Sequence, residues 1–256
     1  MIFDTHAHYD DKAFDEDRES LLLSLPESGI GAVVNVGADL ESTKKTIELI
    51  RRYPFFYGAA GIHPSETEKI GDADMLSLEE LAKEERIVAV GEIGLDYYWK
   101  EPKHQIQKKW FLCQIALARK LRLPVIIHSR DAAKDTLDII KAEKGGEIGG
   151  VIHCFSYSRE VAREYLNMGF FLGIGGVLTF QNARQLKEVV EYAPADRLVL
   201  ETDCPYLSPA PYRGKRNSSL MLPLVVRAMA EIKGISCQEV QEITWNNAKT
   251  LYRLLP

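Results

Sequence analysis

The sequence predicts a TIM barrel, a closed (β/α)8 sheet surrounded by helices, in a single domain. Eight short runs of apolar and β-branched residues recur along the 256-residue chain, with amphipathic helical stretches between them. Continuous apolar strands joined by helical crossovers are typical of a parallel sheet covered on both faces, and eight units in about 250 residues favour a closed barrel. The expected strands are residues 2–5, 32–36, 55–60, 87–90, 124–127, 150–152, 170–174 and 198–200.

Helical patterns fill the intervals between these strands. They are expected at residues 17–25, 42–52, 77–85, 104–121, 131–143, 158–168 and 183–192. Two more follow the last strand, at 220–233 and 236–254, and the second opens with Ser236 and Glu239 in the spacing of a capping box. No low-complexity segment or long linker interrupts the alternation, so residues 1–256 are expected to form one domain.

The composition argues against a membrane protein and against broad binding of duplex nucleic acid. No run approaches the roughly 18 apolar residues of a membrane span, and charged residues interrupt the amino-terminal segment. The formal net charge is −5, whereas a phosphate-binding surface is basic. The four cysteines form no CxxC motif, which favours reduced thiols. We expect a cytoplasmic protein with no membrane association and no obligate protein partner.

Five of the six histidines fall at the carboxyl end of an expected strand. His6 and His8 close the first strand, His128 the fifth and His153 the sixth, while His63 follows the third. Catalytic groups converge on the C-terminal rim of a (β/α)8 barrel, and chance rarely places so many histidines there. His6 and His8 are two residues apart, so both side chains leave the same face, roughly 6.5 Å apart, and can bind one ion.

Acidic residues occupy the remaining strand ends, with Glu92 after the fourth strand and Glu201 and Asp203 on the eighth. A carboxylate at the inward end of an apolar strand is costly to bury unless a cation compensates its charge. Four imidazoles and two carboxylates suit two divalent ions that share a ligand, and zinc, magnesium and manganese all stay open. The expected metal ligands are His6, His8, Glu92, His128, His153 and Asp203.

Six motifs occur in order along the chain: Phe3-Asp4-Thr5-His6-Ala7-His8, Gly61-Ile62-His63-Pro64, Gly91-Glu92-Ile93-Gly94-Leu95-Asp96-Tyr97, His128-Ser129-Arg130, His153-Cys154-Phe155-Ser156 and Glu201-Thr202-Asp203-Cys204-Pro205-Tyr206-Leu207. Together they resemble the TatD family of metal-dependent hydrolases, in the amidohydrolase-like superfamily. The match runs from Phe3 to Trp245-Asn246-Asn247-Ala248 and covers nearly the whole chain. The resemblance implies a TIM barrel, divalent metals and a deoxyribonuclease that trims single strands. It also implies the six metal ligands just named.

One segment departs from the family pattern. The family usually reads Arg-Asn-Glu-Pro after its basic loop, whereas this chain has Arg216-Asn217-Ser218-Ser219. The missing carboxylate leaves the role of this loop and the substrate range open.

The ligand set suggests how a phosphoester bond would be cut. A water shared by two ions would be acidified toward hydroxide and attack phosphorus, while the ions neutralise the phosphate. Glu92, with two oxygens, is the natural bridge between the ions, and both Glu92 and Asp203 are expected to take part in catalysis. The hypothesis places His6, His8 and Asp203 around one ion and His128 and His153 around the other.

Two further residues are candidates for catalysis beside the metal ligands. Glu201 shares a face with Asp203, so it either orients a ligand histidine or accepts the proton of the nucleophile, unless it forms a structural salt bridge. His63 lies outside the predicted metal shell and is expected to contact a substrate phosphate oxygen or the leaving group.

Basic and aromatic residues near the rim are candidates for binding the substrate, which we expect to be single-stranded DNA or another phosphoester. Arg130, Arg213 and Arg216 can contact phosphates, with solvated surface charge as an equal alternative. The loop aromatics Tyr97, Tyr98, Trp99 and Tyr206 can stack on an unpaired base or simply pack on their neighbours.

Two other functions fit the same pattern. An amidohydrolase or esterase acting on a cyclic amide or an acyl-tRNA is the main alternative, because the same His-x-His barrel site activates water for attack on a carbonyl. Many such enzymes bridge their metals with a modified lysine, and Glu92 in that place favours phosphoester chemistry. A non-catalytic barrel that binds metal or a partner protein is opposed only by the completeness of the ligand set.

Overall fold

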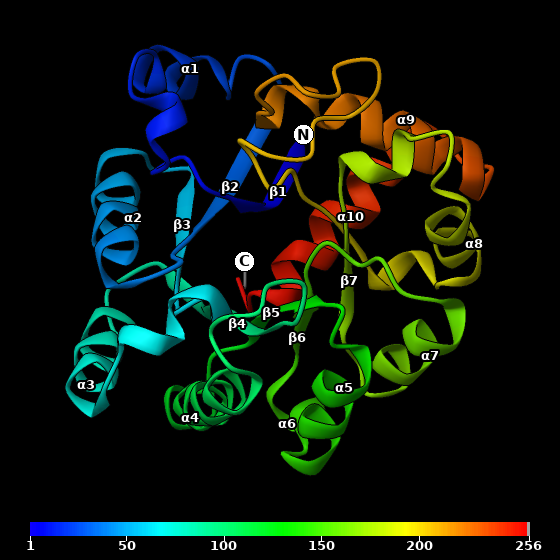
Figure 1. The fold of residues 1–256 in the computed structure, drawn as a ribbon. Coiled ribbons are helices and arrows are strands. Elements are labelled where there is room, and N and C mark those ends of the chain that lie inside the picture. Colours follow the sequence, from blue (N-terminus) through cyan, green and yellow to red (C-terminus); the bar gives the residue numbers. More distant parts are fainter. Residues whose placement is uncertain (255–256) are drawn as a thin grey trace.

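Eight parallel strands form one sheet in the order β1 to β8, and a parallel bridge between Ala7 and Cys204 joins its two edges. The computed structural model describes residues 1–254 and confirms the predicted TIM barrel. Figure 1 shows the strands at the centre and the helices around them. The strands are β1 (Ile2–Ala7), β2 (Ile30–Val36), β3 (Phe56–Ala60), β4 (Ile87–Asp96), β5 (Val125–Arg130), β6 (Gly150–Ile152), β7 (Phe171–Ile174) and β8 (Leu198–Leu200).

Helices connect successive strands and cover the outside of the barrel. They are α1 (Arg18–Ser24), α2 (Leu40–Arg52), α3 (Asp72–Leu81), α4 (His104–Leu121), α5 (Ala133–Ala142), α6 (Gly145–Ile148), α7 (Arg159–Asn167), α8 (Arg184–Tyr192), α9 (Leu222–Lys233) and α10 (Cys237–Leu251). Short 3-10 helices lie in the loops: η1 (Lys12–Phe14), η2 (Pro64–Lys69), η3 (Gly176–Thr179), η4 (Ala195–Arg197) and η5 (Ser219–Met221). In residues 1–254, no helix has the length and apolar character needed to cross a membrane.

The core has two layers, because alternate residues of each strand face the helices or the barrel interior. In β2, Asn35 faces outward and its amide donates to Thr46 of α2 at 2.7 Å, while Val34 belongs to the buried cluster inside the barrel. Tyr252, just after α10, joins that inner cluster, and its hydroxyl donates to the Thr5 carbonyl oxygen at 2.7 Å. The carboxyl-terminal helix therefore closes the end of the barrel where the strands begin.

The main difference from the expected elements is β4, which continues to Asp96 instead of ending at residue 90. Gly91 and Gly94 lie in this segment, and glycines in a sequence commonly indicate that a strand is interrupted. In the structure they allow β4 and β5 to approach closely, because a Cβ on Gly94 would lie 2.0 Å from the His128 carbonyl oxygen. Glu92 therefore lies within β4 and not after it.

Two helix starts illustrate how local sequence sets the boundaries. The capping box that opens α10 is confirmed, since Ser236 Oγ accepts from the Glu239 amide at 3.1 Å and the Ser236 amide donates to Glu239 at 2.8 Å. The expected helix at 77–85 instead spans Asp72–Leu81, because the Asp74 carboxylate accepts from the Gly71 amide at 2.8 Å and starts the helix one turn earlier.

We expect replacement of Gly150 by alanine to lower the free energy of unfolding by about 3 kcal/mol, through overpacking. A Cβ there would lie 2.2 Å from the Val125 carbonyl oxygen, on the neighbouring strand. Gly29 is the matched control, because it also has a positive φ of 85° but a Cβ would meet nothing within 4 Å. Its alanine variant should lose only about 1 kcal/mol. Equal urea midpoints for the two variants would contradict this account.

Candidate metal centre

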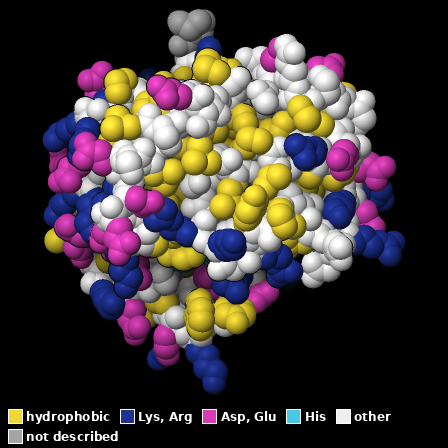
Figure 2. Space-filling model, turned by 90° about the horizontal axis from the view of Figure 1, so that it is seen from above, with side chains coloured by type: hydrophobic (Ala, Val, Ile, Leu, Met, Phe, Trp, Pro, Cys, Tyr) yellow, Lys and Arg dark blue, Asp and Glu magenta, His cyan; other side chains and the backbone are white. Residues whose placement is uncertain are grey.

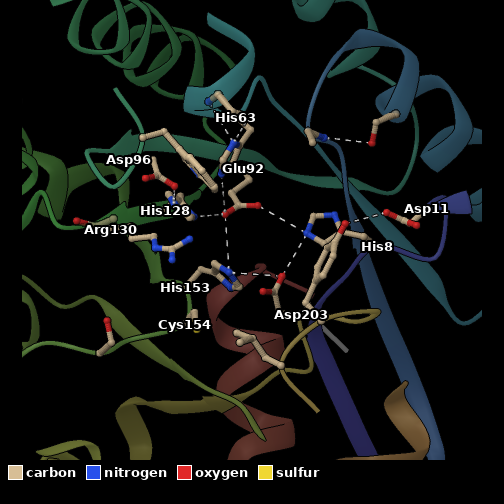
Figure 3. A pocket seen from close by; sticks show the side chains of 18 of the residues that line it. His8, Asp11, His63, Glu92, Asp96, His128, Arg130, His153, Cys154 and Asp203 are labelled. Carbon is tan, nitrogen blue, oxygen red and sulfur yellow. Dashed lines mark hydrogen bonds and ion pairs between the residues drawn. The ribbon is translucent and has the colours of Figure 1, made fainter. Parts of the chain in front are cut away.

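The carboxyl ends of the strands surround a cavity of about 850 Å³. Figure 3 shows imidazole and carboxylate side chains pointing into it from both sides. None of the histidines of residues 1–254 is visible on the face drawn in Figure 2. The cavity lining includes His8, His63, Glu92, His128, His153 and Asp203.

The two histidines of the first strand converge, as predicted. His6 and His8 bring their Nε2 atoms to 3.1 Å from one another. The register of β1 shifts against β2 between Asp4 and Ala7, which marks a β-bulge beside His6. His8 Nδ1 lies 2.8 Å from the Val36 carbonyl oxygen. Because a carbonyl only accepts, the proton of neutral His8 is on Nδ1, and the lone pair of Nε2 faces the cavity.

Glu92 lies between the two groups of histidines and is only 4% exposed. Its Oε2 faces the β1 pair, at 3.4 Å from His6 Nε2 and 3.7 Å from His8 Nε2. Its Oε1 faces the other side, at 2.7 Å from His128 Nδ1 and 3.7 Å from His153 Nε2. A register shift against β5 between Val90 and Ile93 places a bulge at this residue, and bulges commonly re-aim a side chain.

Asp203 follows β8 and completes the set. Its Oδ1 lies 3.4 Å from His8 Nε2, 3.8 Å from His6 Nε2 and 3.7 Å from His153 Nε2. The amide of Asp203 donates to the His6 carbonyl oxygen at 2.9 Å, which ties the β8 end to β1. The structure therefore brings together all six residues that the sequence predicted as metal ligands.

Glu201 lies behind His153 and outside the cavity lining. Its Oε2 is 3.2 Å from His153 Nδ1, and its Oε1 accepts the Cys154 amide at 2.6 Å. Gly173 makes room for this carboxylate, because a Cβ there would lie 2.2 Å from Glu201 Oε2. Of the two roles considered for Glu201, this position favours orienting His153 over accepting a proton from water in the cavity.

Asp96 is a site residue whose role the sequence does not predict. It is buried at the end of β4, and its Oδ2 lies 3.1 Å from His128 Nε2. His128 therefore has Glu92 at one ring nitrogen and Asp96 at the other. The arrangement repeats that of His153 and Glu201, with a carboxylate behind the ring. Only the extension of β4 beyond the two glycines reveals it.

His63 carries its proton on the ring nitrogen that faces the cavity, whereas neutral His8 carries it on the other nitrogen. Its Nε2 lies 3.8 Å from Glu92 Oε1, while its Nδ1 accepts from the Ser65 amide at 3.2 Å. Burial lowers the pKa of His63 to about 4, so the ring is neutral at neutral pH. A neutral ring that accepts at Nδ1 carries its proton on Nε2, which then offers a donor and no lone pair to the cavity. This agrees with a position outside the metal shell.

The three arginines predicted for substrate binding occupy different environments. Arg130 lines the cavity. Arg213 stacks on Phe180, with its guanidinium carbon 4.2 Å from the ring centroid. Arg216 forms a two-fold ion pair with Asp17 at 2.7 and 2.5 Å. Neither Arg213 nor Arg216 lines the cavity, so their contact with substrate stays a prediction.

The pKa values show how the charges balance without metal. Burial opposes a charge on each histidine ring. At His8 this effect is outweighed by Asp203 and Glu92, which raise the pKa of the ring to about 9. The pKa of His128 is raised to about 9 by Asp96 and Glu92, and that of His153 to about 10 by Glu201 and Asp203, again against burial. Burial opposes ionisation of Glu92 too, yet the surrounding histidines hold its pKa well below the usual range.

The donor set fits divalent metal ions. The partners of Glu92 and Asp203 within ion-pair distance are histidines, with no lysine or arginine among residues 1–254. Buried His6 Nδ1 has no hydrogen-bond partner. Ligand atoms lie within 4.8 Å of one another in three groups: His6, His8 and Asp203; His6, His153 and Glu201; His63, Glu92 and His128. Imidazole and carboxylate ligands at such spacing are typical of metal centres.

Comparison with known proteins identifies the family. A model of the TatD-related DNases matches residues 3–253. The chain belongs to the TatD family of metal-dependent hydrolases. The metal-dependent hydrolase YabD of Bacillus subtilis is 43% identical over 99% of this chain and 100% of its own length, and YcfH of Escherichia coli is 36% identical over 99% and 96%. The crystal structure of YjjV, a TatD homolog from Escherichia coli, superposes with a TM-score of 0.93 at 30% identity and covers 100% and 98% of the two chains.

The segment that departs from the TatD pattern supports the strand ends from behind. Asn217 donates to the Thr202 and Tyr206 carbonyl oxygens at 2.9 and 2.8 Å. The Ser219 hydroxyl donates to Asp4 at 2.6 Å, and Asp4 also accepts from the Thr202 amide at 3.0 Å. Since Thr202 precedes Asp203, this buried network joins β1 to the segment after β8 that carries Asp203. In this chain the segment therefore has a positioning role.

We expect Asp96→Asn to weaken metal binding at least about tenfold, because an uncharged amide no longer favours the His128 orientation. Competition with a chromophoric chelator measures the affinity, and elemental analysis gives the metal content. Asp135→Asn is the control, since Asp135 binds Tyr97 and Lys108 outside the cavity. Unchanged affinity in the Asp96 variant would remove its positioning role.

We also expect metal binding to release protons at neutral pH. Metal needs neutral imidazoles, whereas the metal-free pKa values of His8, His128 and His153 lie at about 9, 9 and 10. Affinity should therefore rise with pH until these values are passed. The same raised pKa values stabilise the metal-free protein below the unfolded value of about 6.5, and this stability is lost as the pH rises through 9 to 10. Calorimetry in buffers of different ionisation enthalpy counts the protons, and zero release at neutral pH contradicts the assignment.

Proposed function

We propose that this protein hydrolyses phosphodiester bonds in single-stranded DNA with two divalent metal ions, zinc, magnesium or manganese. The position of Glu92 carries the proposal, because its two oxygens face two different groups of histidines. We assign His6, His8 and Asp203 to one ion, His128 and His153 to the other, and Glu92 to both. The description of the matching family as TatD-related DNases supports the choice of substrate.

Bound there, the ions would supply an acidified water and neutralise charge on the phosphate. The chain itself provides the orientation of the ligands. The Val36 carbonyl fixes His8 with its Nε2 lone pair toward the cavity, and Glu201 and Asp96 support His153 and His128 from behind. Such outer contacts fix ring orientation and tautomer and thereby tune metal affinity.

His63 is proposed to bind a substrate phosphate oxygen. Its Nε2 proton points toward Glu92 and the cavity, and its Nδ1 is held by Ser65. A ring with a pKa of about 4 is neutral at neutral pH and donates a hydrogen bond without transferring its proton. Of the two roles predicted for His63, a contact with the phosphate is therefore favoured over protonation of the leaving group.

Arg130 supplies a permanent positive charge to the cavity, whose described lining holds no other arginine and no lysine. It lies on the same side of the site as Asp96 and His128, opposite His8 and Asp11 (Figure 3). An anionic substrate is therefore expected to approach over Arg130. Arg213 and Arg216 remain candidates only for contacts with phosphates of the DNA strand that lie farther from the cavity.

A substrate panel tests this function and separates it from the amidohydrolase and esterase alternative. We expect the metal-loaded protein to shorten a labelled single-stranded oligodeoxynucleotide, to lose this activity on chelation, and to regain it with manganese, zinc or magnesium. The comparison substrates are the same strand in a duplex, an RNA strand, an acyl-tRNA and a dihydropyrimidine. Turnover of a carbonyl substrate with intact DNA would overturn the proposal.

His63→Ala is the matched variant in the same assay. It removes a donor to the phosphate but no metal ligand, so metal content should stay unchanged while turnover falls about 100-fold. Loss of metal in this variant would instead place His63 in the metal shell.

A further inference from the structure

An aromatic and cationic surface lies on one side of the cavity mouth, formed by the loop that follows β4 and by Arg130 at the end of β5. Tyr98 and Trp99 are 54% and 56% exposed, which is unusual for large aromatic side chains. Their rings meet edge to face at a centroid distance of 4.8 Å. Trp99 lines the cavity together with Arg130. We call Tyr98, Trp99 and Arg130 the mouth cluster.

The base of this loop is fixed although its tip is exposed. Tyr97 stacks on His104 of α4 at 3.6 Å, and its hydroxyl donates to Asp135 at 2.7 Å. The Tyr98 amide donates to Asp96 at 3.0 Å. Packing therefore holds the first residues of the loop, while the rings of Tyr98 and Trp99 that follow stay exposed to solvent and Trp99 lines the cavity.

Arg130 is held by an aromatic ring and not by a carboxylate. Its guanidinium carbon lies 3.8 Å from the centroid of the Tyr98 ring, a stacked position. Among residues 1–254, it has no acidic side chain within ion-pair distance. Its remaining N–H groups are therefore available to an anionic ligand, and a stacked guanidinium binds phosphate with fixed geometry.

The opposite wall has the opposite charge. Asp10 and Asp11 line that side of the cavity, and Tyr206 donates to Asp11 at 2.9 Å, which places its ring beside the same acidic pair. A polyanionic chain is repelled there and attracted to Arg130. The cavity of about 850 Å³ exceeds the space that one phosphate needs and lies in the range of sites for ligands of nucleotide size or larger.

We propose that the mouth cluster binds the nucleotide next to the scissile phosphodiester, with its base stacked on Trp99 and its other phosphate bound by Arg130. This subsite rests on the proposed function, since it adds the recognition of a neighbouring unpaired nucleotide to the same cavity. A base inside a duplex is stacked on both faces and cannot offer one to Trp99 without leaving the stack, so the cluster favours single strands.

The test compares thymidine trinucleotide with its abasic analogue, a small substrate that keeps the phosphodiester backbone but has no base to stack. We expect Trp99→Ala to raise the KM for the trinucleotide about tenfold, as loss of one stacked base does, and to leave the small substrate within about twofold. Trp99→Phe should restore most of the affinity. Tyr192→Ala is the control, because Tyr192 is an exposed aromatic of α8 outside the cavity lining.

A modified trinucleotide tests Arg130 separately. Replacing its second phosphate by a neutral methylphosphonate should raise the KM of the wild-type protein, whereas the KM of Arg130→Gln should be the same for both trinucleotides. If Arg130→Gln still discriminates between them as the wild type does, Arg130 does not bind that phosphate.

Tryptophan fluorescence separates failure of the subsite from failure of the proposed function. The trinucleotide should quench the wild-type emission, and Trp99→Phe should lack this quenching because neither of the other two tryptophans lines the cavity. Trp110 is buried in α4, and Trp245 of α10 packs on the cluster inside the barrel. Quenching by Trp99 without hydrolysis would overturn the proposed function and leave the subsite standing. Hydrolysis with an unchanged KM in both Trp99→Ala and Arg130→Gln would overturn the subsite alone.

Discussion

A buried carboxylate surrounded by imidazoles is the constraint on which the site depends. Glu92 is 4% exposed, and its two oxygens face histidines from the ends of four strands. An ionised carboxylate in such a place is strongly unfavourable unless positive charge compensates it. Because the ion-pair partners of Glu92 among residues 1–254 are histidines, the compensation comes from protons or metal ions on these rings. The closed barrel makes this arrangement possible, since only a ring of parallel strands brings all these carboxyl ends to one point.

The second contact of each ring decides what the ring can do. The Val36 carbonyl makes Nδ1 of His8 a donor and leaves the lone pair of Nε2 for metal. The Ser65 amide makes Nδ1 of His63 an acceptor and leaves the proton on Nε2 for substrate. Carboxylates behind His128 and His153 favour protonation of the held nitrogen, and so act like the carbonyl behind His8. In the proposed assignment, these four similar side chains thus divide into three metal ligands and one phosphate donor through partners that the histidines alone do not reveal.

The sequence predicts the barrel and the ligand set because both depend on periodic features. Strand and helix alternate along the chain, and five histidines occupy strand ends that the fold must gather. It does not predict Asp96, because the glycines of β4 imitate a strand break and only the close approach to β5 explains them. The ion pair of Arg216 with Asp17 is equally hidden, since it joins segments far apart in sequence. Periodicity thus reports which residues share a rim, whereas individual partners depend on side-chain packing.

The net charge of −5 limits how such a protein can hold a polyanion. An extended basic surface would bind phosphates nonspecifically and would respond steeply to salt. Here the cationic side chain that lines the cavity is Arg130, and Asp10 and Asp11 stand on the opposite wall. Under the proposed function, most of the attraction for phosphate therefore comes from the metal centre, with direction supplied by a few local contacts. The metal ions that would compensate Glu92 would then also be the main anion-binding site, so the constraint that organises the ligands would also select an anionic substrate.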